Sequence, residues 1–457
     1  MKRINSLFVG LAFVALGATA QTDNTVTDYK RSSLYTIILD DHGLMDNTKA
    51  AIIKETFANT PLPEKFNDHN LSIRTFNPRN YKVTDAEVAA VTGGEEKKKK
   101  GGFGKAIGGF AKGVAGSATA GLVDTTDTKK LPAIFIKFFE DKKIGNQLVA
   151  KWYNMKGTYD SSTNSYFDMD LIKQRGLYNA SEFDKMVADK STRGIAMLAD
   201  AGEELINNTF VIGIRFNYVS KEEMAKQLSQ ASSTVSSLLG GTAAALTNSA
   251  VQAGSAVAGK GYVIKATAFL YQLDWSEEVN TKFYTQYYNA ADLTDFANSD
   301  DFKLKYVGTV TEWADIQSSM FSSKPESDLV ERATVRAIDE VVAKLQKRYE
   351  EFRTKTPLLT TDPEVTAAIG LKEGLEGGDK FEVLEKNVDP ETMITTYKRV
   401  ATLKVDKNNI WDNRYAADEE QAENAASGQG AVQTIKATTF TGGNKKIYPG
   451  MLIRQID

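Results

Sequence analysis

The chain has 457 residues and a formal net charge of −3, with 42% hydrophobic and 25% charged residues, as in ordinary globular proteins. This charge gives no overall attraction to nucleic acid, and the absence of cysteine excludes disulfides, thiolate metal sites, cysteine nucleophiles and a lipid-modified cysteine. The chain has only two histidines, which argues against triad hydrolases and histidine-rich metal sites. We therefore expect a protein without enzymatic activity and without a cofactor.

Residues 1–20 have the order of a secretory signal peptide. Lys2 and Arg3 precede an apolar stretch over residues 7–16, and small residues lead up to Ala20. The apolar stretch is about half of the roughly 20 residues that a membrane-spanning helix needs. We expect cleavage after Ala20 and release of the mature chain, so the predicted location is the periplasm or the outer membrane surface.

Residues 21–225 are predicted to form an N-terminal α/β region. The β-branched and aromatic run 33–39 predicts a buried strand, which a helix capped by Asp46 and a strand over 71–76 follow. We expect further strands over 133–139 and 209–216, a strand or strand edge over 144–154, and a helix over 191–206.

Residues 226–360 are predicted to form a second α/β region. Its expected strands are 262–275 and 304–311. Residues 326–352 predict the strongest helix of the chain, because apolar residues recur at spacings of three and four along one face. Strands interspersed with helices favour α/β or α+β layers, so this helix should pack on a sheet.

Residues 370–457 change to short predicted strands separated by glycine turns. The expected strands are 380–384, 397–405 and 434–441, and a last one lies close to the end of the chain. This pattern predicts a small C-terminal β-barrel or sandwich module.

Two tracts of small residues interrupt the α/β regions. Residues 101–123 lie in a glycine-rich insertion over 93–128, and residues 230–260 form an insertion rich in alanine, glycine and serine. Each tract separates two stretches that read as strands, which suggests a duplicated hairpin with an elaborated tip. Small residues four apart would let helices approach closely, as in membranes, but glycine-rich sequence also makes flexible linkers. A flexible insertion, a membrane-associated helix and a spanning element all remain open.

The end of the first predicted strand carries Asp40, Asp41 and His42, where α/β proteins often place functional groups. The alternative is a solvated loop without a binding role. Asp160, Asp168 and nearby Asp170 lack the glycine-centred loop of a calcium site, so we expect no metal there.

A run of four lysines precedes the first tract. A basic run of this kind can meet phosphate or anionic lipid, although it is more often a solvated loop. The four residues are Lys97, Lys98, Lys99 and Lys100.

The C-terminal segment resembles the β module of the flagellar assembly protein T family. The residues that carry the resemblance are Gly374, Gly377-Gly378-Asp379, Phe381-Glu382-Val383 and Tyr448-Pro449-Gly450-Met451. The strands and the long helix before it resemble the periplasmic α/β domains of that family and of curli secretion channel proteins, whose lipid-attachment cysteine this chain lacks. The resemblance implies a periplasmic scaffold attached to an envelope assembly.

Three hypotheses of function follow. The first is a non-enzymatic periplasmic scaffold or assembly protein that binds other envelope proteins and not nucleic acid. The second is a membrane-associated oligomer that uses the two small-residue tracts. The third is a carboxylate-based enzyme centred on Asp40 and Asp41.

Overall fold

The fold was analysed in a computed structural model. The structure describes residues 32–40, 47–63, 66–93, 125–156, 166–168, 206–220, 262–315, 325–353, 355–388, 395–426 and 435–456. The expected signal peptide and both small-residue tracts lie outside these ranges.

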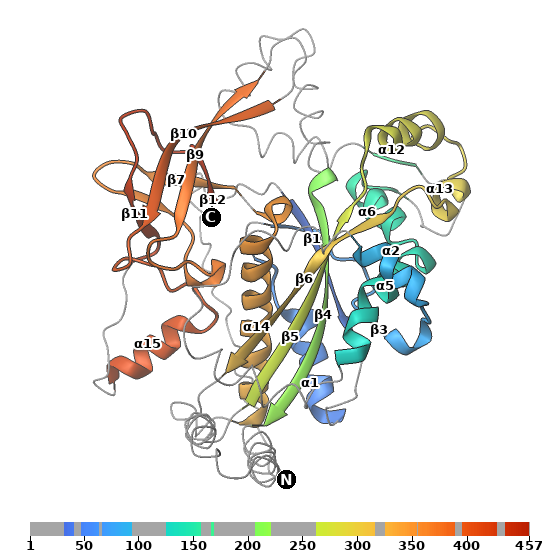
Figure 1. Ribbon diagram of the computed structural model, residues 1–457, viewed down its shortest axis with the longest axis horizontal. Coiled ribbons are helices and arrows are strands. Elements are labelled where there is room, and N and C mark those ends of the chain that lie inside the picture. Colours follow the sequence, from blue (N-terminus) through green and yellow to red (C-terminus); the bar gives the residue numbers. More distant parts are fainter. Residues whose placement is uncertain are drawn as a thin grey trace, which may run out of the picture.

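A mixed β-sheet forms the centre of the α/β part (Figure 1). Its strands run in the order β2-β1-β4-β5-β6, and β3 also pairs with β1. β1 is parallel to its neighbours, whereas β4, β5 and β6 follow one another as antiparallel strands. The strands are β1 (Ser32–Leu39), β2 (Phe66–Asp68), β3 (Thr75–Phe76), β4 (Thr209–Ser220), β5 (Tyr262–Leu273) and β6 (Leu304–Asp315).

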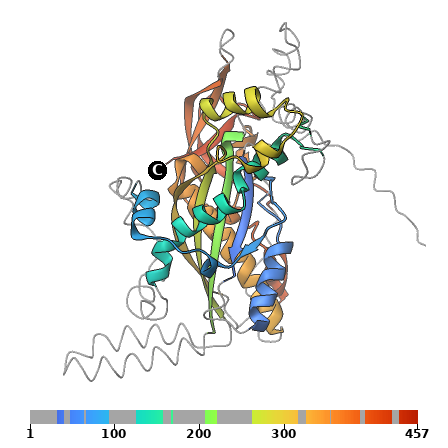
Figure 2. The same ribbon diagram turned by 90° about the vertical axis from the view of Figure 1, so that its right-hand side faces the viewer.

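Helices cover both faces of this sheet. One face packs on α2 (Asp85–Thr92), α5 (Thr125–Asp141), α6 (Ile144–Trp152), α12 (Glu277–Lys282) and α13 (Thr294–Asn298) around an aromatic core. A π-helical turn, η4 (Phe283–Tyr287), continues α12. The other face packs on α1 (Asn47–Asn59) and α14 (Glu326–Arg348), which lie side by side (Figures 1 and 2). The result is a three-layer α/β/α body.

The long helix α14 confirms its predicted apolar face. Leu329, Val330, Ala333, Ala337 and Val341 are buried in the core that the helix shares with the sheet. The spacing of three and four places them on one stripe, which explains why the sequence pattern was sufficient. A short 3-10 turn, η5 (Glu350–Phe352), ends the segment.

The C-terminal part is a closed β-barrel, which lies beside α14 on the side away from the sheet (Figure 1). The barrel confirms the predicted C-terminal β module, although its first strand begins at Thr356 rather than after residue 370. Its strands close in the order β10-β11-β8-β7-β12-β9 around a core of its own. They are β7 (Thr356–Thr360), β8 (Val365–Ala367), β9 (Lys380–Val388), β10 (Thr395–Val405), β11 (Thr438–Gly442) and β12 (Leu452–Ile456), with η6 (Leu371–Glu373) and α15 (Ala417–Ala426) between them.

Two predicted strands of the first region are wrong. Residues 133–139 belong to helix α5, and residues 144–154 mostly to helix α6. In α5, Leu131, Phe135, Phe138 and Phe139 face the core at helical spacing. The partly buried Ile134 and Ile136 leave Lys137 as the one charged residue of the run 133–139, and such a short apolar run fits a buried helix as well as a strand.

The predicted strand over 71–76 is much shorter in the structure. Only Thr75 and Phe76 pair with β1, because side chains tie the preceding residues to that strand instead. The Arg74 side chain donates from Nε to the Thr36 carbonyl oxygen (3.0 Å), and the Thr36 amide donates to Asn70 Oδ1 (2.9 Å).

The boundary expected at residues 225 and 226 falls between two paired strands. β4 and β5 pair from Phe210 opposite Gln272 to Ser220 opposite Tyr262, so both expected α/β regions contribute to one sheet. The tract over 230–260 therefore interrupts a hairpin, as predicted. The tract over 101–123 instead lies between helices α2 and α5. The strand predicted after it, 133–139, is wrong, and the strand predicted before it is reduced to Thr75 and Phe76, so the duplicated hairpin is wrong.

Within the described ranges, no helix combines the length and the apolar character that crossing a membrane requires.

Candidate functional site

Asp40 ends strand β1 and takes part in a structural ion pair. Its Oδ2 lies 2.8 Å from Nζ of Lys54 on α1, and its amide donates to the Phe76 carbonyl oxygen (2.8 Å). The carboxylate thus fastens α1 to the end of β1, and the backbone amide fastens β3 there. Asp41 and His42, and the run Lys97, Lys98, Lys99 and Lys100, lie outside the described residues.

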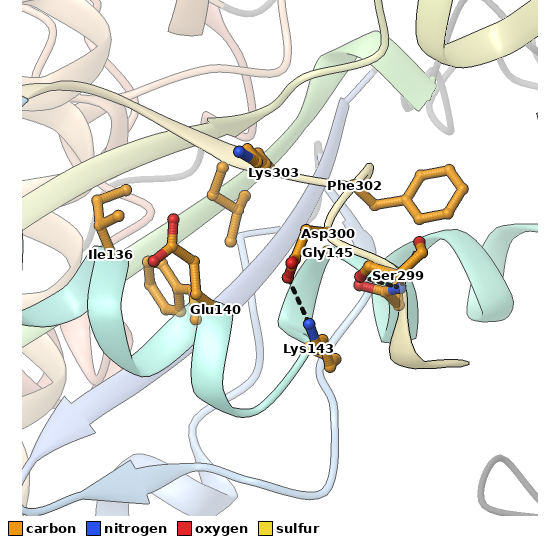
Figure 3. Close-up of a pocket in the computed structure, with 11 residues that line it drawn as sticks. Ile136, Glu140, Lys143, Gly145, Ser299, Asp300, Phe302 and Lys303 are labelled. Carbon is orange, nitrogen blue, oxygen red and sulfur yellow. Dashed lines mark hydrogen bonds and ion pairs between the residues drawn. The ribbon is translucent and has the colours of Figure 1, made fainter. Parts of the chain in front are cut away.

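A small cavity lies between α5, α6 and the segment before β6 (Figure 3). Its volume is about 50 Å³, with Phe139, Asn146 and Phe302 among its lining residues. At its lining, Nζ of Lys143 lies 2.5 Å from Oδ1 of Asp300. This space holds a few water molecules and is far below the several hundred cubic ångströms of a typical ligand pocket.

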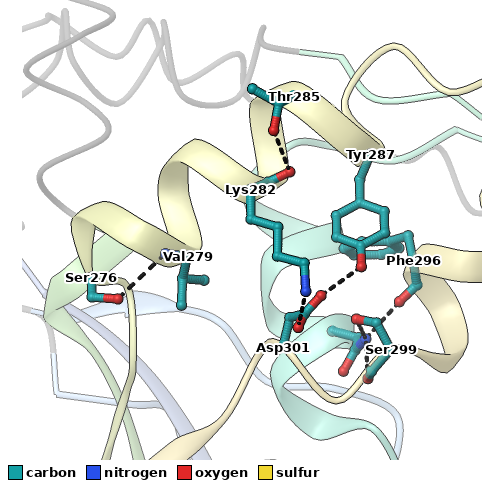
Figure 4. A network of polar contacts seen from close by, with 9 residues as sticks. Ser276, Val279, Lys282, Thr285, Tyr287, Phe296, Ser299 and Asp301 are labelled. Carbon is teal, nitrogen blue, oxygen red and sulfur yellow. Dashed lines mark hydrogen bonds and ion pairs between the residues drawn. The ribbon is translucent and has the colours of Figure 1, made fainter.

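Beside this cavity, Asp301 holds the helical insertion between β5 and β6 together (Figure 4). Nζ of Lys282 donates to its Oδ1 (2.6 Å), and the Tyr287 hydroxyl donates to its Oδ2 (2.5 Å). Burial alone would raise the pKa of Asp301, but the hydrogen bonds from Lys282 and Tyr287 outweigh it and lower the pKa. Burial, together with the hydrogen bond to Asp301, raises the pKa of Tyr287. The network is a structural lock that favours ionised Asp301.

Replacing Asp301 with asparagine is expected to lower the free energy of unfolding by about 1–2 kcal/mol at pH 7, since charge-assisted hydrogen bonds are lost at a partly exposed site. Because the folded pKa is lowered, Asp301 contributes stability above its unfolded value, and this stability is lost as the pH falls through the folded value. Urea unfolding from pH 3 to 7 measures both effects. Asp295→Asn, at an exposed carboxylate of the same insertion, is the control and should change stability much less. Equal losses in the two variants would contradict the lock.

The most extensive cluster of charged groups lies where α14 meets the barrel. The charged residues of α14 recur at helical spacing on a face that the sheet does not cover. They are Arg332, Arg336, Asp339, Glu340 and Lys347. We call this contact between α14 and the barrel module the junction.

Ion pairs hold the two ends of the junction. Near the start of α14, Arg332 pairs with Glu419 of α15. Near its end, Nζ of Lys347 lies 3.1 Å from Oε1 of Glu376 and 3.6 Å from Oδ2 of Asp379. Each partner belongs to the barrel module, so the contacts cross from one module to the other.

A second set of charges follows beyond the end of α14. Arg454 of β12 donates to Oε1 of the buried Glu382 on β9 (2.7 Å from Nε), and its Nη1 lies 3.3 Å from Oε1 of Glu350. Arg353 donates from Nη2 to the Lys347 carbonyl oxygen (2.9 Å). A groove of about 320 Å³ opens here. Its lining residues come from both modules, and most of them are charged, with both signs present. They are Ser32, Asn208, Glu350, Glu351, Arg353, Lys355 and Arg454.

The centre of the junction is occupied by the carboxyl group of Asp339, which is 7% exposed. Its Oδ1 lies 3.9 Å from Nζ of Lys372 on η6. Burial raises the pKa of Asp339 to about 7, with Lys372 opposing and Glu373 reinforcing the shift. Burial also raises the pKa of the neighbouring Glu340, against the opposing charges of Arg414 and Arg336.

Little in the amino-acid pattern predicts this junction. The charges on α14 look like an ordinary solvated helix face, because a charged stripe opposite an apolar stripe is typical of surface helices. Their only unusual feature is that Arg332, Arg336, Asp339 and Lys347 share one stripe on a helix that already buries its opposite face.

The comparisons leave the chain without an assigned relative. No protein-family model matches it, and no curated protein is similar to it. The resemblance to the flagellar assembly protein T family and to curli secretion channel proteins therefore stays a prediction. In the part of the chain that the structure describes, no three histidine, aspartate or glutamate side chains gather as a metal site would require.

Proposed function

We propose that the chain is an exported, non-enzymatic scaffold of the cell envelope that binds other envelope proteins. The observation that carries the proposal is the build of two modules with separate cores, joined through a charged junction. Interfaces between domains that are this polar resemble transient protein–protein interfaces rather than permanent cores. A scaffold needs two surfaces whose relative position is defined but can change. Two modules joined through a charged junction supply such surfaces.

Two of the sequence features support the same proposal. Residues 1–20 have the pattern of an export signal, and a chain without cysteine folds independently of the redox state of its compartment. Charged groups of the fold form ion pairs with one another, such as Asp40 with Lys54 and Asp301 with Lys282. Such pairs stabilise the body and leave recognition to its outer surface.

Fractionation of cells that express the full chain tests the proposal. A scaffold is expected in the periplasmic fraction, or on membranes from which high salt and carbonate release it, with the native mass of a monomer or a defined complex. Cross-linking in intact cells should then join it to a reproducible set of envelope proteins. Retention of the chain in the cytoplasm would contradict the proposal, and so would a specific turnover activity that a point mutation such as Asp40→Asn abolishes.

A second candidate is a membrane-associated oligomer, which one further observation favours. The chain re-enters the body after the first tract beside the strand that leads to the second. Ser220 and Tyr262, the described residues on either side of the second tract, pair in β4 and β5. Arg215, five residues before Ser220, donates from Nη1 to Thr128 in the first turn of α5 (3.2 Å), which follows the first tract. Residue 128, after tract 101–123, thus lies next to β4, the strand that precedes tract 230–260.

Replacing each tract with a glycine-serine linker of equal length separates the two candidates. For a membrane-associated oligomer, the parent chain should stay on carbonate-washed membranes in a large particle, and either replacement should release it as a smaller species. For a scaffold, fractionation and native mass should be unchanged by the replacements. A replacement chain that keeps its circular dichroism spectrum shows that the body is still folded.

A further inference from the structure

Asp339 lies where the barrel module approaches α14 most closely. One helical turn further along, Ala343 faces Gly374 at the end of η6, and a Cβ atom added to that glycine would lie 3.1 Å from Cβ of Ala343. Ala343 is itself buried. Beside this contact only 9% of the Asp339 side chain is exposed, and movement of the barrel module away from the helix would hydrate the carboxyl group further.

The carboxyl group is poorly satisfied in this space. Among the described residues, no group hydrogen bonds to its Oδ2, and Nζ of Lys372 at 3.9 Å from Oδ1 is beyond hydrogen-bond distance. A buried carboxylate without such bonds is unfavourable, whereas a protonated carboxyl group is neutral and can donate.

The charges that face Asp339 come from each element packed around it. On its own helix, Arg336 favours the ionised form and Glu340 disfavours it. On η6, Lys372 favours the ionised form and Glu373 disfavours it. Neighbouring charges therefore act in both directions, and burial remains the largest effect on Asp339.

The surrounding groups are held in place by contacts within the barrel module. Oε2 of Glu373 accepts from the Gly370 amide (2.7 Å) and from Nδ2 of Asn413 (2.9 Å). The Arg414 guanidinium donates to both carboxylate oxygens of Asp412, at 2.8 Å each. Because Glu373 and Arg414 are already engaged, they are not expected to turn toward Asp339 when it ionises, and separation of the modules would hydrate the carboxylate.

We propose that Asp339 makes the docking of the barrel module on α14 sensitive to pH, with the docked arrangement favoured in mild acid and loosened above neutral pH. The direction of this pH dependence follows from the number of protons that the docked and undocked arrangements bind. A carboxyl group exposed to water titrates near 3.8, whereas the buried group titrates near 7. The docked arrangement binds the proton more tightly, so its advantage is complete below the exposed value and is lost as the pH rises through the docked value. Between pH 6 and 8 the ratio of undocked to docked molecules should rise about tenfold.

Distance measurement between two spin labels tests the proposal, and the cysteine-free chain allows labels at chosen positions. Glu55→Cys on α1 and Glu385→Cys on β9 place one label on an exposed position of each module. Double electron–electron resonance of the purified full chain at pH 5, 6, 7 and 8 should give one narrow distance at pH 5. A second, broader population should grow with a midpoint near pH 7.

Asp339→Asn carries the decisive comparison, because the amide has the shape of the carboxyl group and stays neutral. In this variant the narrow distance should persist up to pH 8. The control variant Asp418→Asn, at an exposed position on α15, should keep the pH dependence of the parent. A parent distance that does not change with pH would overturn the proposal, and so would an equal change in parent and Asp339→Asn.

A second measurement covers the case in which Asp339→Asn folds poorly. Hydrogen exchange of the parent chain at matched intrinsic exchange rates should show protection of α14 peptides that falls as the pH rises from 5 to about 7 and then levels off, while β5 peptides keep theirs. Protection of α14 that is constant from pH 5 to 8 would overturn the proposal without any variant. Neither measurement depends on the location or partners of the protein, so its failure leaves the scaffold proposal standing.

Discussion

Replacing Trp152 with alanine is expected to lower the free energy of unfolding by about 3–5 kcal/mol, the usual cost of removing a large buried aromatic side chain. The indole is fully buried, its Nε1 donates to Oγ1 of Thr209 (2.6 Å), and its ring lies tilted against that of His69 at 5.1 Å between centroids. His69 in turn contacts the Leu148 carbonyl oxygen through Nε2 (2.9 Å). The substitution therefore opens a cavity where α6, β4 and the segment after β2 meet.

Urea unfolding followed by circular dichroism measures this loss, since the fluorescence of the variant changes with the indole itself. Trp152→Phe is the matched variant: it keeps most of the volume but leaves the buried hydroxyl of Thr209 without the indole donor, so about 1–2 kcal/mol should be lost. Tyr166→Ala, at a side chain that is 59% exposed, should leave stability nearly unchanged. A loss below about 1 kcal/mol for Trp152→Ala would contradict the packing of α6 on the sheet.

Trp152 also shows where the sequence pattern misleads. Aromatic residues near the end of segment 144–154 favour a strand by propensity, but the burial in α6 follows the helical repeat from Ile144 through Leu148 to Trp152. Local propensity is weak, and packing against a neighbouring element overrides it. Both Trp152 and its neighbour Tyr153 lie in the core.

The patterns that predicted correctly share a strong local period. The stripe of α14 over several helical turns and the alternating strands of the barrel could each be read without knowledge of the neighbours. The closure of the barrel could not be, because strand pairing depends on residues such as Leu452 and Leu384 that lie far apart in the sequence. The sequence therefore predicts a β-barrel or a sandwich and does not decide between the two.

The candidate site lies at the limit of what a single sequence predicts. Asp40 was singled out from its place after a strand, but its partner Lys54 follows from the packing of α1 and not from any motif. The junction depends on the docking of two modules whose contacts, such as Lys347 with Glu376, join segments with no shared pattern. Charged residues on a helix are normally solvated, so only the fold distinguishes the few that face a second module.

Replacing Arg454 with alanine is expected to lower the free energy of unfolding by about 3 kcal/mol, because removing one partner of a buried ion pair leaves the other charge uncompensated. The stranded charge is Glu382, which is 7% exposed and accepts from Nε and Nη2 of Arg454 at 2.7 and 2.6 Å. Arg454 also reaches Glu350 at the end of α14, so its loss should affect both the barrel and its attachment to the body. Urea unfolding measures the total, and hydrogen exchange of β9 and β12 peptides locates it.

Two further variants separate these contributions. Glu350→Gln removes only the outer partner, which is 68% exposed, and a solvated pair of this kind is worth at most about 1 kcal/mol. The double variant Arg454→Met/Glu382→Leu removes both buried charges, and it should recover most of the stability that Arg454→Ala loses, since apolar residues of similar volume replace buried pairs at little cost. If the double variant were as unstable as Arg454→Ala, the loss would come from packing of the arginine stem and not from the stranded carboxylate. Recovery of stability together with raised hydrogen exchange at η5 would instead show that Arg454 stabilises the barrel through Glu382 and attaches it to the body through Glu350.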